Sequence, residues 1–218
     1  LRWVLVMTKL FLFDFDGTLV DSAPDLISSA NYIFDVYEKK SISYEEGREI
    51  ASDGVNAYLR MRFDNNFDTL TEEFLMHYSN NILNNTVFFE GIPEVLELIK
   101  KRNLYWGIVT NKSRVLTEKI LKFYGLLYHA DILICGDDGL TPKPSPEMLI
   151  RACNSLDVDT KDTIYIGDGL RDIQAAISAK MKSVLACYGY LKTNDDIESW
   201  GADFFIHHPD EIIHLVNS

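Results

Sequence analysis

Short runs of apolar residues alternate along the chain with longer stretches in which apolar residues recur at helical spacing. Each run has the length and composition that are typical of a buried strand. The predicted strands are residues 10–13, 105–109, 132–135, 163–166, 183–186 and 204–206. Capping or turn residues and then helical spacing follow the first four, as where Ser145 is a candidate N-cap and Pro146 a candidate first helical residue. Strand, loop and helix in repeated order predict an α/β fold with a parallel sheet.

The interval from about residue 21 to residue 85 breaks this rhythm, because it has helical spacing without a convincing strand pattern. The predicted helices in this interval are residues 24–37, 44–51, 56–63 and 72–83. Capping-box patterns at Ser43 to Glu46 and at Thr69 to Glu72 predict helix starts near residues 44 and 70. We therefore predict a Rossmann-like α/β core domain of residues 1–18 and 88–218, with an all-helical domain of residues 19–87 inserted after the first strand.

The chain is acidic, since 21 Lys and Arg residues stand against 33 Asp and Glu residues and give a formal net charge of −12. Such a charge repels nucleic acids and anionic membranes at long range, so we expect neither as a partner. An anionic substrate must then be held by local positive charge or by a metal ion. The length of 218 residues suffices for one core with a small insertion.

The three cysteines, Cys135, Cys153 and Cys187, are widely spaced and form no C-x-x-C pair, which argues against a disulfide framework or a zinc site. We expect them to be small core residues of a cytoplasmic protein. No apolar run approaches the length of a membrane-spanning helix, and the apolar opening segment lacks the cleavage site of a signal peptide. Residues 1–6 precede Met7 and are set aside as a candidate upstream extension.

Two carboxylates directly follow the first predicted strand. Asp14 and Asp16 are two residues apart, so their side chains point the same way if the strand geometry persists. Ligands of open α/β sheets bind beyond the carboxyl ends of the strands, which is where this pair would lie. A bare D-x-D-G segment is more often a solvated turn, so the interpretation depends on the residues at the ends of the other strands.

Polar residues of compatible kinds come after two further strands. Thr110 and Asn111 come after residues 105–109 and offer a hydroxyl and a helix N-terminus suited to anion binding. Asp168 comes after residues 163–166, with Asp172 four residues later, and Lys143 lies in a proline-restricted segment between the two regions. Several carboxylates at one edge of a sheet repel one another, so we predict a Mg²⁺ ion with oxygen ligands and a phosphate bound beside it.

These segments resemble, in chain order, the four motifs of haloacid-dehalogenase-superfamily phosphatases. The matching segments are DFDGTLVDS at 14–22, VTNK at 109–112, KPSP at 143–146 and GDGLRD at 167–172. Within the superfamily the chain resembles phosphoglycolate phosphatases, which carry a helical cap after the first motif. A closer likeness, in LFLFDFDGTLVDSAPD, WGIVTNKS, RDIQAA and YGYL followed by WGAD, is to proteobacterial N-acetylmuramic acid 6-phosphate phosphatases. Lys180 departs from the glycine that is usual at its position.

The resemblance implies a Mg²⁺-dependent phosphomonoester hydrolase that works through an aspartyl-phosphate. Asp14 would be the nucleophile, and Asp16 would protonate the leaving oxygen and later deprotonate water. The implied phosphate-binding residues are Gly17, Thr18, Thr110, Asn111 and Lys143, and the implied metal ligands are Asp14, Asp16 through its carbonyl, Asp168 and Asp172. A cap would choose the leaving group. The candidate selecting residues of the cap are Arg48, Ser52 and Gly54, with Asp53, Arg60 and Arg62 nearby.

The substrate and the reaction class leave alternatives. We expect a small phosphorylated metabolite, either 2-phosphoglycolate or N-acetylmuramic acid 6-phosphate, and a monomeric or homodimeric enzyme. A phosphomutase would use the same aspartyl-phosphate, and a carbon–halogen hydrolase would not need Asp16. A non-enzymatic binding scaffold predicts a missing catalytic group, and the four motifs lack none.

Overall fold

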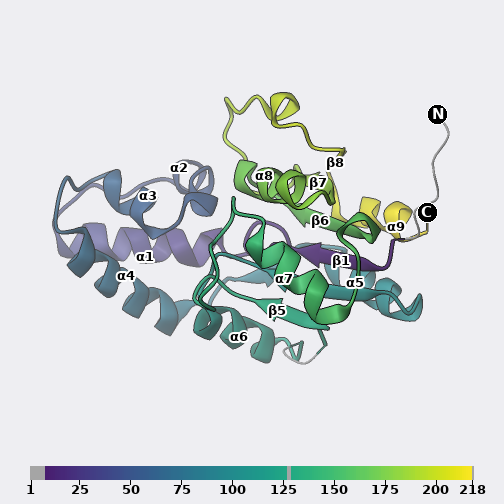
Figure 1. Cartoon of the computed structure of the whole chain (residues 1–218). Helices are drawn as coiled ribbons and strands as arrows, with labels where there is room; N and C mark the ends of the chain where they lie inside the picture. Colours follow the sequence, from purple (N-terminus) through teal and green to yellow (C-terminus); the bar gives the residue numbers. More distant parts are fainter. Residues whose placement is uncertain (1–7, 127–128, 218) are drawn as a thin grey trace.

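The computed structural model describes residues 8–126 and 129–217 of the chain. Its centre is a six-stranded sheet in the order β5-β4-β1-β6-β7-β8, in which every neighbouring pair is parallel (Figure 1). The strands are β1 (Leu10–Phe13), β4 (Tyr105–Val109), β5 (Ile132–Ile134), β6 (Thr163–Gly167), β7 (Lys182–Ala186) and β8 (Phe204–Ile206). The chain leaves β1 toward one edge and later returns to its other side, and ligands of such sheets bind at this switch point.

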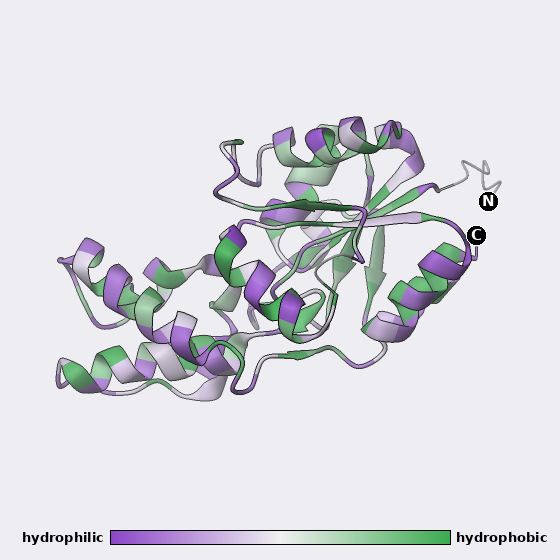
Figure 2. Cartoon of the chain, turned by 90° about the horizontal axis from the view of Figure 1, so that it is seen from below, coloured by the Kyte–Doolittle hydropathy of each residue, from purple (hydrophilic) through white to green (hydrophobic). Residues whose placement is uncertain are grey.

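Helices cover both faces of the sheet. The helices α5 (Ile92–Lys101), α6 (Arg114–Phe123) and α9 (Ile212–Val216) contribute to one apolar cluster, and α7 (Glu147–Leu156) and α8 (Leu170–Ala179) to another. The alternation of β1 divides its side chains between them: Phe11 and Phe13 join the first cluster, and Leu10 and Leu12 the second. Figure 2 shows the corresponding pattern, with hydrophobic strands and helices that carry both hydrophobic and hydrophilic residues.

The first four helices after β1 gather beside one end of the sheet (Figure 1). They are α1 (Ala23–Val36), α2 (Tyr44–Arg48), α3 (Val55–Arg60) and α4 (Phe67–Asn81), with a 3₁₀ turn, η1 (Ala51–Asp53), between α2 and α3. The segments that enter and leave this helical group pair as a short antiparallel ribbon of β2 (Val20–Asp21) and β3 (Val87–Phe88), which the pattern did not predict. We call residues 22–86 the helical insertion; its division from the core as a separate domain stays a prediction.

The predicted strands agree with β1 and β4–β8 to within one residue at each end. The capping box at the start of α2 is also confirmed, because the hydroxyl of Ser43 accepts from the amide of Glu46 and the Glu46 carboxylate accepts from the amide of Ser43. The predicted helix start near residue 70 is wrong. The helix α4 begins at Phe67, after Asn66 turns the chain in the left-handed conformation with φ of 60°.

The start of α7 differs from its prediction by one position. Pro146 is the N-cap and Glu147 the first helical residue, while the hydroxyl of Ser145 accepts from the amide of Glu147 at 3.3 Å. Smaller connecting turns are η2 (Thr160–Asp162), η3 (Ile197–Trp200) and η4 (Pro209–Glu211). They place the chain for β6, β8 and α9 and contribute no residue to the cluster of Asp14, Asp168 and Asp172.

The cysteines are free thiols, of which Cys135 and Cys153 are buried and Cys187 is half-buried. Burial raises the pKa of each thiol, to about 12 for Cys135, as expected for small core residues. Across residues 8–126 and 129–217, no helix combines the length and the hydropathy needed to cross a membrane. The segment 1–6, set aside from the sequence, and Met7 lie outside the described residues.

Candidate active site

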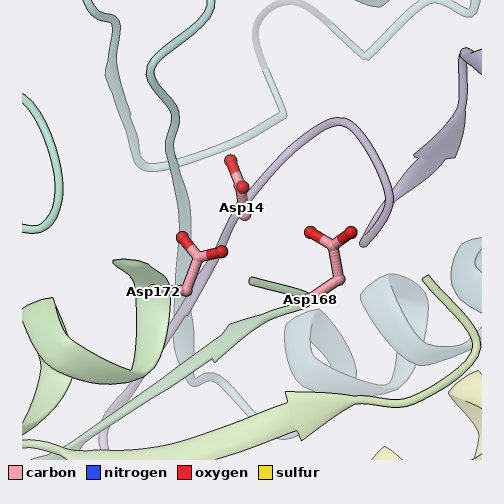
Figure 3. Close-up of side chains that lie close together, drawn as sticks. All are labelled: Asp14, Asp168 and Asp172. Carbon is pink, nitrogen blue, oxygen red and sulfur yellow. The ribbon is translucent and has the colours of Figure 1, made fainter. Parts of the chain in front are cut away.

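Three buried carboxylates meet at the carboxyl ends of β1 and β6. Asp14 follows β1, Asp168 follows β6, and Asp172 lies in the first turn of α8. One carboxylate oxygen from each residue lies within 4.8 Å of the other two (Figure 3). This confirms that the parallel topology brings residues from distant parts of the sequence to one edge, and oxygen ligands at this spacing fit a hard divalent cation.

Lys143 neutralises two of these carboxylates. Its ammonium lies 2.9 Å from Oδ1 of Asp14 and donates at 2.7 Å to Oδ1 of Asp172 and to the hydroxyl of Tyr165. Burial lowers the pKa of Lys143, but the charges of Asp14 and Asp172 outweigh it, so the net pKa is above the usual value. Three partners occupy the three donors of the ammonium, and the side chain is fully buried behind Asp14.

Asp14 is held in one orientation. Its Oδ1 accepts from the amide of Phe15 at 2.7 Å and faces Lys143, which leaves Oδ2 as the oxygen without a hydrogen bond among the described residues. Burial raises the pKa of Asp14, and the Lys143 ammonium opposes that rise. Both Asp14 and the partly exposed Asp16 line the central cavity, as their spacing predicted.

Asp168 is the carboxylate of the cluster without a lysine. Its Oδ2 accepts from the amide of Tyr190 at 2.8 Å and from the hydroxyl of Ser52 at 2.9 Å. Its Oδ1 is buried without a hydrogen-bond partner among residues 8–126 and 129–217. Burial, with the nearby charges of Asp172 and Asp14, raises the pKa of Asp168 to about 7. An orphaned buried oxygen and the mutual repulsion of the carboxylates both fit a cation site.

Asp16 lies apart from the cluster and is held by its own lysine. The ammonium of Lys112 donates to both carboxylate oxygens of Asp16, at 3.0 and 3.1 Å, and to the hydroxyl of Tyr78 on α4, at 2.8 Å. Ser22 donates to Oδ1 of Asp16 at 2.5 Å. The four carboxylates and the two lysines together leave two negative charges, which matches a divalent cation.

The residues predicted to bind phosphate have different surroundings. Thr110 lines the cavity, and its hydroxyl oxygen accepts from the amide of Lys112 at 3.2 Å, which leaves its proton free for a ligand. The side chain of Asn111 is used within the protein instead: it donates to the carbonyl of Lys143 and accepts from the amide of Lys143, both at 3.0 Å. Asn111 therefore holds the loop that contains Lys143 beside β4.

Gly17 and Thr18 form the turn after Asp16. Gly17 has φ of 77°, and a Cβ on it would lie 2.2 Å from Oδ2 of Asp168, so the turn requires glycine. Thr18 is fully buried, and its hydroxyl has no hydrogen-bond partner among the described residues. The side chain of Thr18 therefore packs inside the turn, and the cavity wall is formed by other residues.

A cavity of about 280 Å³ lies between the carboxyl ends of β1 and β4 and the helical insertion. Residues of the core and of the helical insertion line this cavity. They are Asp14, Asp16, Leu26, Ala51, Ser52, Gly54, Val55, Leu75, Tyr78, Thr110, Asn111, Lys112, Ser113, Leu116 and Arg171. The candidate selecting residues Ser52 and Gly54 are among them. Arg48 lies elsewhere, because its guanidinium donates to the carbonyl of Tyr188 at 2.8 Å and covers the ring of Tyr190. It ties α2 to the core.

Several residues of the site were not predicted. Lys112 and Arg171 lay inside matching segments, VTNK and GDGLRD, but their types alone did not distinguish them from solvated cations. Tyr78 carried no local signal, because its contact with Lys112 joins residues 34 positions apart. Tyr190 lay inside another matching segment, YGYL, but its contact was not predictable locally, because its hydroxyl accepts from the amide of Ser22 at the start of α1, 168 positions away.

Comparison with known proteins agrees with this geometry. The model of the haloacid dehalogenase-like hydrolase family matches residues 11–186 of the chain. The N-acetylmuramic acid 6-phosphate phosphatase of Pseudomonas aeruginosa is 35% identical over 214 residues, which cover 96% of this chain and 95% of that protein. The phosphoglycolate phosphatase of Xanthomonas campestris pv. campestris is 35% identical over 205 residues, which cover 92% and 93%.

Solved structures share the fold. The crystal structure of a predicted phosphoglycolate phosphatase from Haemophilus somnus has a TM-score of 0.86 at 24% identity and covers 97% of this chain and 99% of that chain. A haloacid dehalogenase-like family hydrolase from Streptococcus pneumoniae has the same TM-score at 18% identity, with 96% and 98% covered. The family match and the full-length relatives show that this chain is an enzyme of the haloacid dehalogenase-like hydrolase family, of the phosphatase type.

Proposed function

We propose that the protein is a Mg²⁺-dependent phosphomonoester hydrolase that acts on a small phosphorylated metabolite through an aspartyl-phosphate on Asp14. The observation that carries the proposal is the position of Asp14, which lies in the buried carboxylate cluster, is held by Lys143 and faces the cavity. A carboxylate that is fixed by an ammonium and exposed to a cavity is suited to nucleophilic attack.

The first step is attack by Asp14. The amide of Phe15 and the ammonium of Lys143 hold Oδ1, so Oδ2 attacks phosphorus in line with the leaving oxygen. The bond from phosphorus to the leaving oxygen breaks as the bond to Oδ2 forms. The Lys143 ammonium favours the ionised form of Asp14, and the hydroxyl of Thr110 donates to a phosphoryl oxygen.

Asp16 transfers a proton in each of the two steps. It protonates the leaving oxygen in the first step and then takes a proton from the water that hydrolyses the aspartyl-phosphate. Lys112 and Ser22 hold its carboxylate in the cavity wall, where both transfers occur. Protonation of the leaving oxygen leaves Asp16 ionised, and the proton that it then takes from the water restores its acid form for the next cycle.

The carboxylates of Asp14, Asp168 and Asp172, with the backbone carbonyl of Asp16, would hold the Mg²⁺ ion. Bound there, the ion supplies positive charge that offsets the charge of the phosphoryl oxygens. The fit rests on the orphaned Oδ1 of Asp168 and on the two negative charges that the lysines leave uncompensated. Oxygen ligands of this kind are those that Mg²⁺ prefers.

Two substrates fit the relatives: 2-phosphoglycolate, by similarity to the Xanthomonas enzyme, and N-acetylmuramic acid 6-phosphate, by similarity to the Pseudomonas enzyme. The cavity wall favours the second. Its apolar residues are Leu26, Ala51, Val55, Leu75 and Leu116. Glycolate has two carbons and no methyl group, whereas N-acetylmuramic acid has a sugar ring and methyl groups on its acetyl and lactyl substituents. A wide apolar wall stabilises the larger leaving group.

The test is an assay of the purified protein with a generic aryl phosphate, 2-phosphoglycolate and N-acetylmuramic acid 6-phosphate, with and without Mg²⁺. We expect Mg²⁺-dependent release of inorganic phosphate that Asp14→Asn abolishes and that Asp35→Asn, a change at an exposed position of α1, leaves intact. Robust activity in Asp14→Asn would refute the proposal. Isomerisation of a sugar phosphate without phosphate release would instead favour a phosphomutase.

A further inference from the structure

The two lysines of the site have no donor left for a substrate. Lys143 contacts Asp14, Asp172 and Tyr165, and it lies behind Asp14. Lys112 lines the cavity, but its three donors are directed at the two oxygens of Asp16 and at the hydroxyl of Tyr78. The positive charges of both lysines are therefore paired with carboxylates of the enzyme.

Arg171 is the remaining cation of the cavity wall. It is half-buried, and within residues 8–126 and 129–217 its guanidinium has neither an ion-pair nor a hydrogen-bond partner. It also borders a neighbouring hollow that includes Ser52 and Lys192, so it lies where the cavity opens toward solvent. Its planar array of five donors is available to a ligand.

The fold gives no reason for an arginine at this position. Arg171 is the second residue of α8, and a cation in the first turn of a helix is disfavoured because the N-terminus carries partial positive charge. No neighbouring carboxylate among the described residues offsets this cost through an ion pair with Arg171. An unfavourable, unpaired charge beside a cavity is better explained by a ligand.

The depth of the cavity separates two ends of a bound substrate. Asp14 and Thr110 are buried at its floor, where the phosphate would react. Arg171 is half-buried at its rim, beside Ser52 of the helical insertion. Arg171 lines the same cavity as Asp14, so the leaving group of a phosphate at Asp14 would occupy the cavity that this guanidinium borders. Both relatives act, by their names, on phosphates of acids, and guanidinium binds carboxylate through two parallel hydrogen bonds.

We propose that Arg171 binds a carboxylate on the leaving group and thereby selects phosphate monoesters of acids over those of neutral alcohols. The inference rests on the proposed phosphatase function and specifies its substrate class. It gives Arg171 the role of a specificity-determining residue, because the contact is made to a part of the substrate where no bond is broken. Such a contact acts on substrate binding and changes KM more than kcat.

The experiment compares two matched pairs of substrates. N-acetylmuramic acid 6-phosphate is paired with N-acetylglucosamine 6-phosphate, which lacks the lactyl acid, and 2-phosphoglycolate is paired with 2-hydroxyethyl phosphate. Arg171→Met should reduce the ratio of kcat/KM between acid and neutral partner by about tenfold or more, mainly through KM, since a hydrogen-bonded charge pair is lost. Arg171→Lys should restore part of the ratio. Arg151→Met, at an exposed position of α7, is the matched control.

The outcomes separate the inference from the function. An equal loss on acid and neutral esters would leave the ratio unchanged, assign Arg171 to the phosphate and overturn the inference. Wild-type kinetics of Arg171→Met on all four esters would overturn it too. In both cases the wild-type enzyme still releases phosphate, so the proposed function stands. A wild-type protein that hydrolyses none of the four esters overturns the function, and the inference with it.

Discussion

The hydroxyl of Ser52, in the 3₁₀ turn of the helical insertion, donates a hydrogen bond to Oδ2 of Asp168 at 2.9 Å. The insertion thus directly contacts a carboxylate of the proposed metal site. Residues that hydrogen-bond to metal ligands orient them, and their loss costs metal affinity. One side chain therefore connects the helical insertion to the carboxylate cluster.

We expect Ser52→Ala to weaken Mg²⁺ binding. The variant leaves Oδ2 of Asp168 with the amide of Tyr190 as its remaining donor, so the Mg²⁺ concentration for half-maximal activity should rise by about tenfold or more. A Mg²⁺ titration of the hydrolysis rate measures this, with Ser155→Ala, at an exposed position of α7, as the control. Equal Mg²⁺ dependence in Ser52→Ala and the wild type would show that the contact does not orient Asp168.

The contact between Tyr78 and Lys112 leads to a second prediction. Tyr78→Phe removes the partner that holds the Lys112 ammonium against Asp16. A hydrogen bond to a charged group contributes about 1.5–3 kcal/mol, so we expect kcat to fall by roughly tenfold with a smaller change in KM. Steady-state kinetics with Tyr105→Phe, on an exposed part of β4, as control would check it. A change in KM alone would mean that Tyr78 only contacts the substrate.

The stability of the metal-free protein should depend on pH through Asp168. Its pKa is raised to about 7, whereas aspartate in an unfolded chain titrates near roughly 3.9. Between these values the folded protein binds a proton that the unfolded chain lacks, so the free energy of unfolding falls as pH rises. In chelator-treated protein, Tm should decrease between about pH 5 and pH 8, and Mg²⁺ should reverse the decrease. Asp168→Asn, which cannot titrate, should flatten the profile, and a steeper profile in that variant would contradict this explanation.

Lys180 ends α8 in the left-handed conformation, with φ of 57°. A side chain is disfavoured there, and glycine is not, so Lys180→Gly should stabilise the protein by about 1 kcal/mol and raise Tm by roughly 2–4 °C. The same change two residues later, Lys182→Gly, lies in β7 and should destabilise it. Thermal unfolding of both variants checks the pair, and a loss of stability in Lys180→Gly would contradict the prediction.

The residues of the site that follow the strands were predictable, because the local pattern of apolar residues determines their positions. Asp14, Thr110 and Asp168 each directly follow an apolar run, and a parallel sheet places the carboxyl ends of such runs at one edge. The position of these residues follows from the ends of the strands alone, so no contact between side chains had to be predicted. Gly17 was predicted as a phosphate-binding residue, and the structure adds that its turn passes too close to Asp168 for any Cβ.

The residues that the helical insertion contributes to the site were not predictable in the same way. Which face of α4 or α2 meets the sheet depends on packing across the whole insertion, where Leu70 and Phe74 are buried in the same cluster as Phe13. Local spacing identifies these helices as amphipathic but does not orient them. For this reason the sequence predicts Arg48 near the substrate, whereas its guanidinium donates to the carbonyl of Tyr188, and the sequence does not predict the contact of Tyr78.

The central claim is that Asp14 carries the phosphoryl group during turnover. The most direct measurement is peptide mass mapping of the enzyme quenched with acid during steady-state hydrolysis in the presence of Mg²⁺. We expect a phosphoryl adduct on the peptide that contains Asp14, absent in Asp14→Asn. Rapid hydrolysis without any adduct in a single turnover, or an adduct on another residue, would contradict the claim.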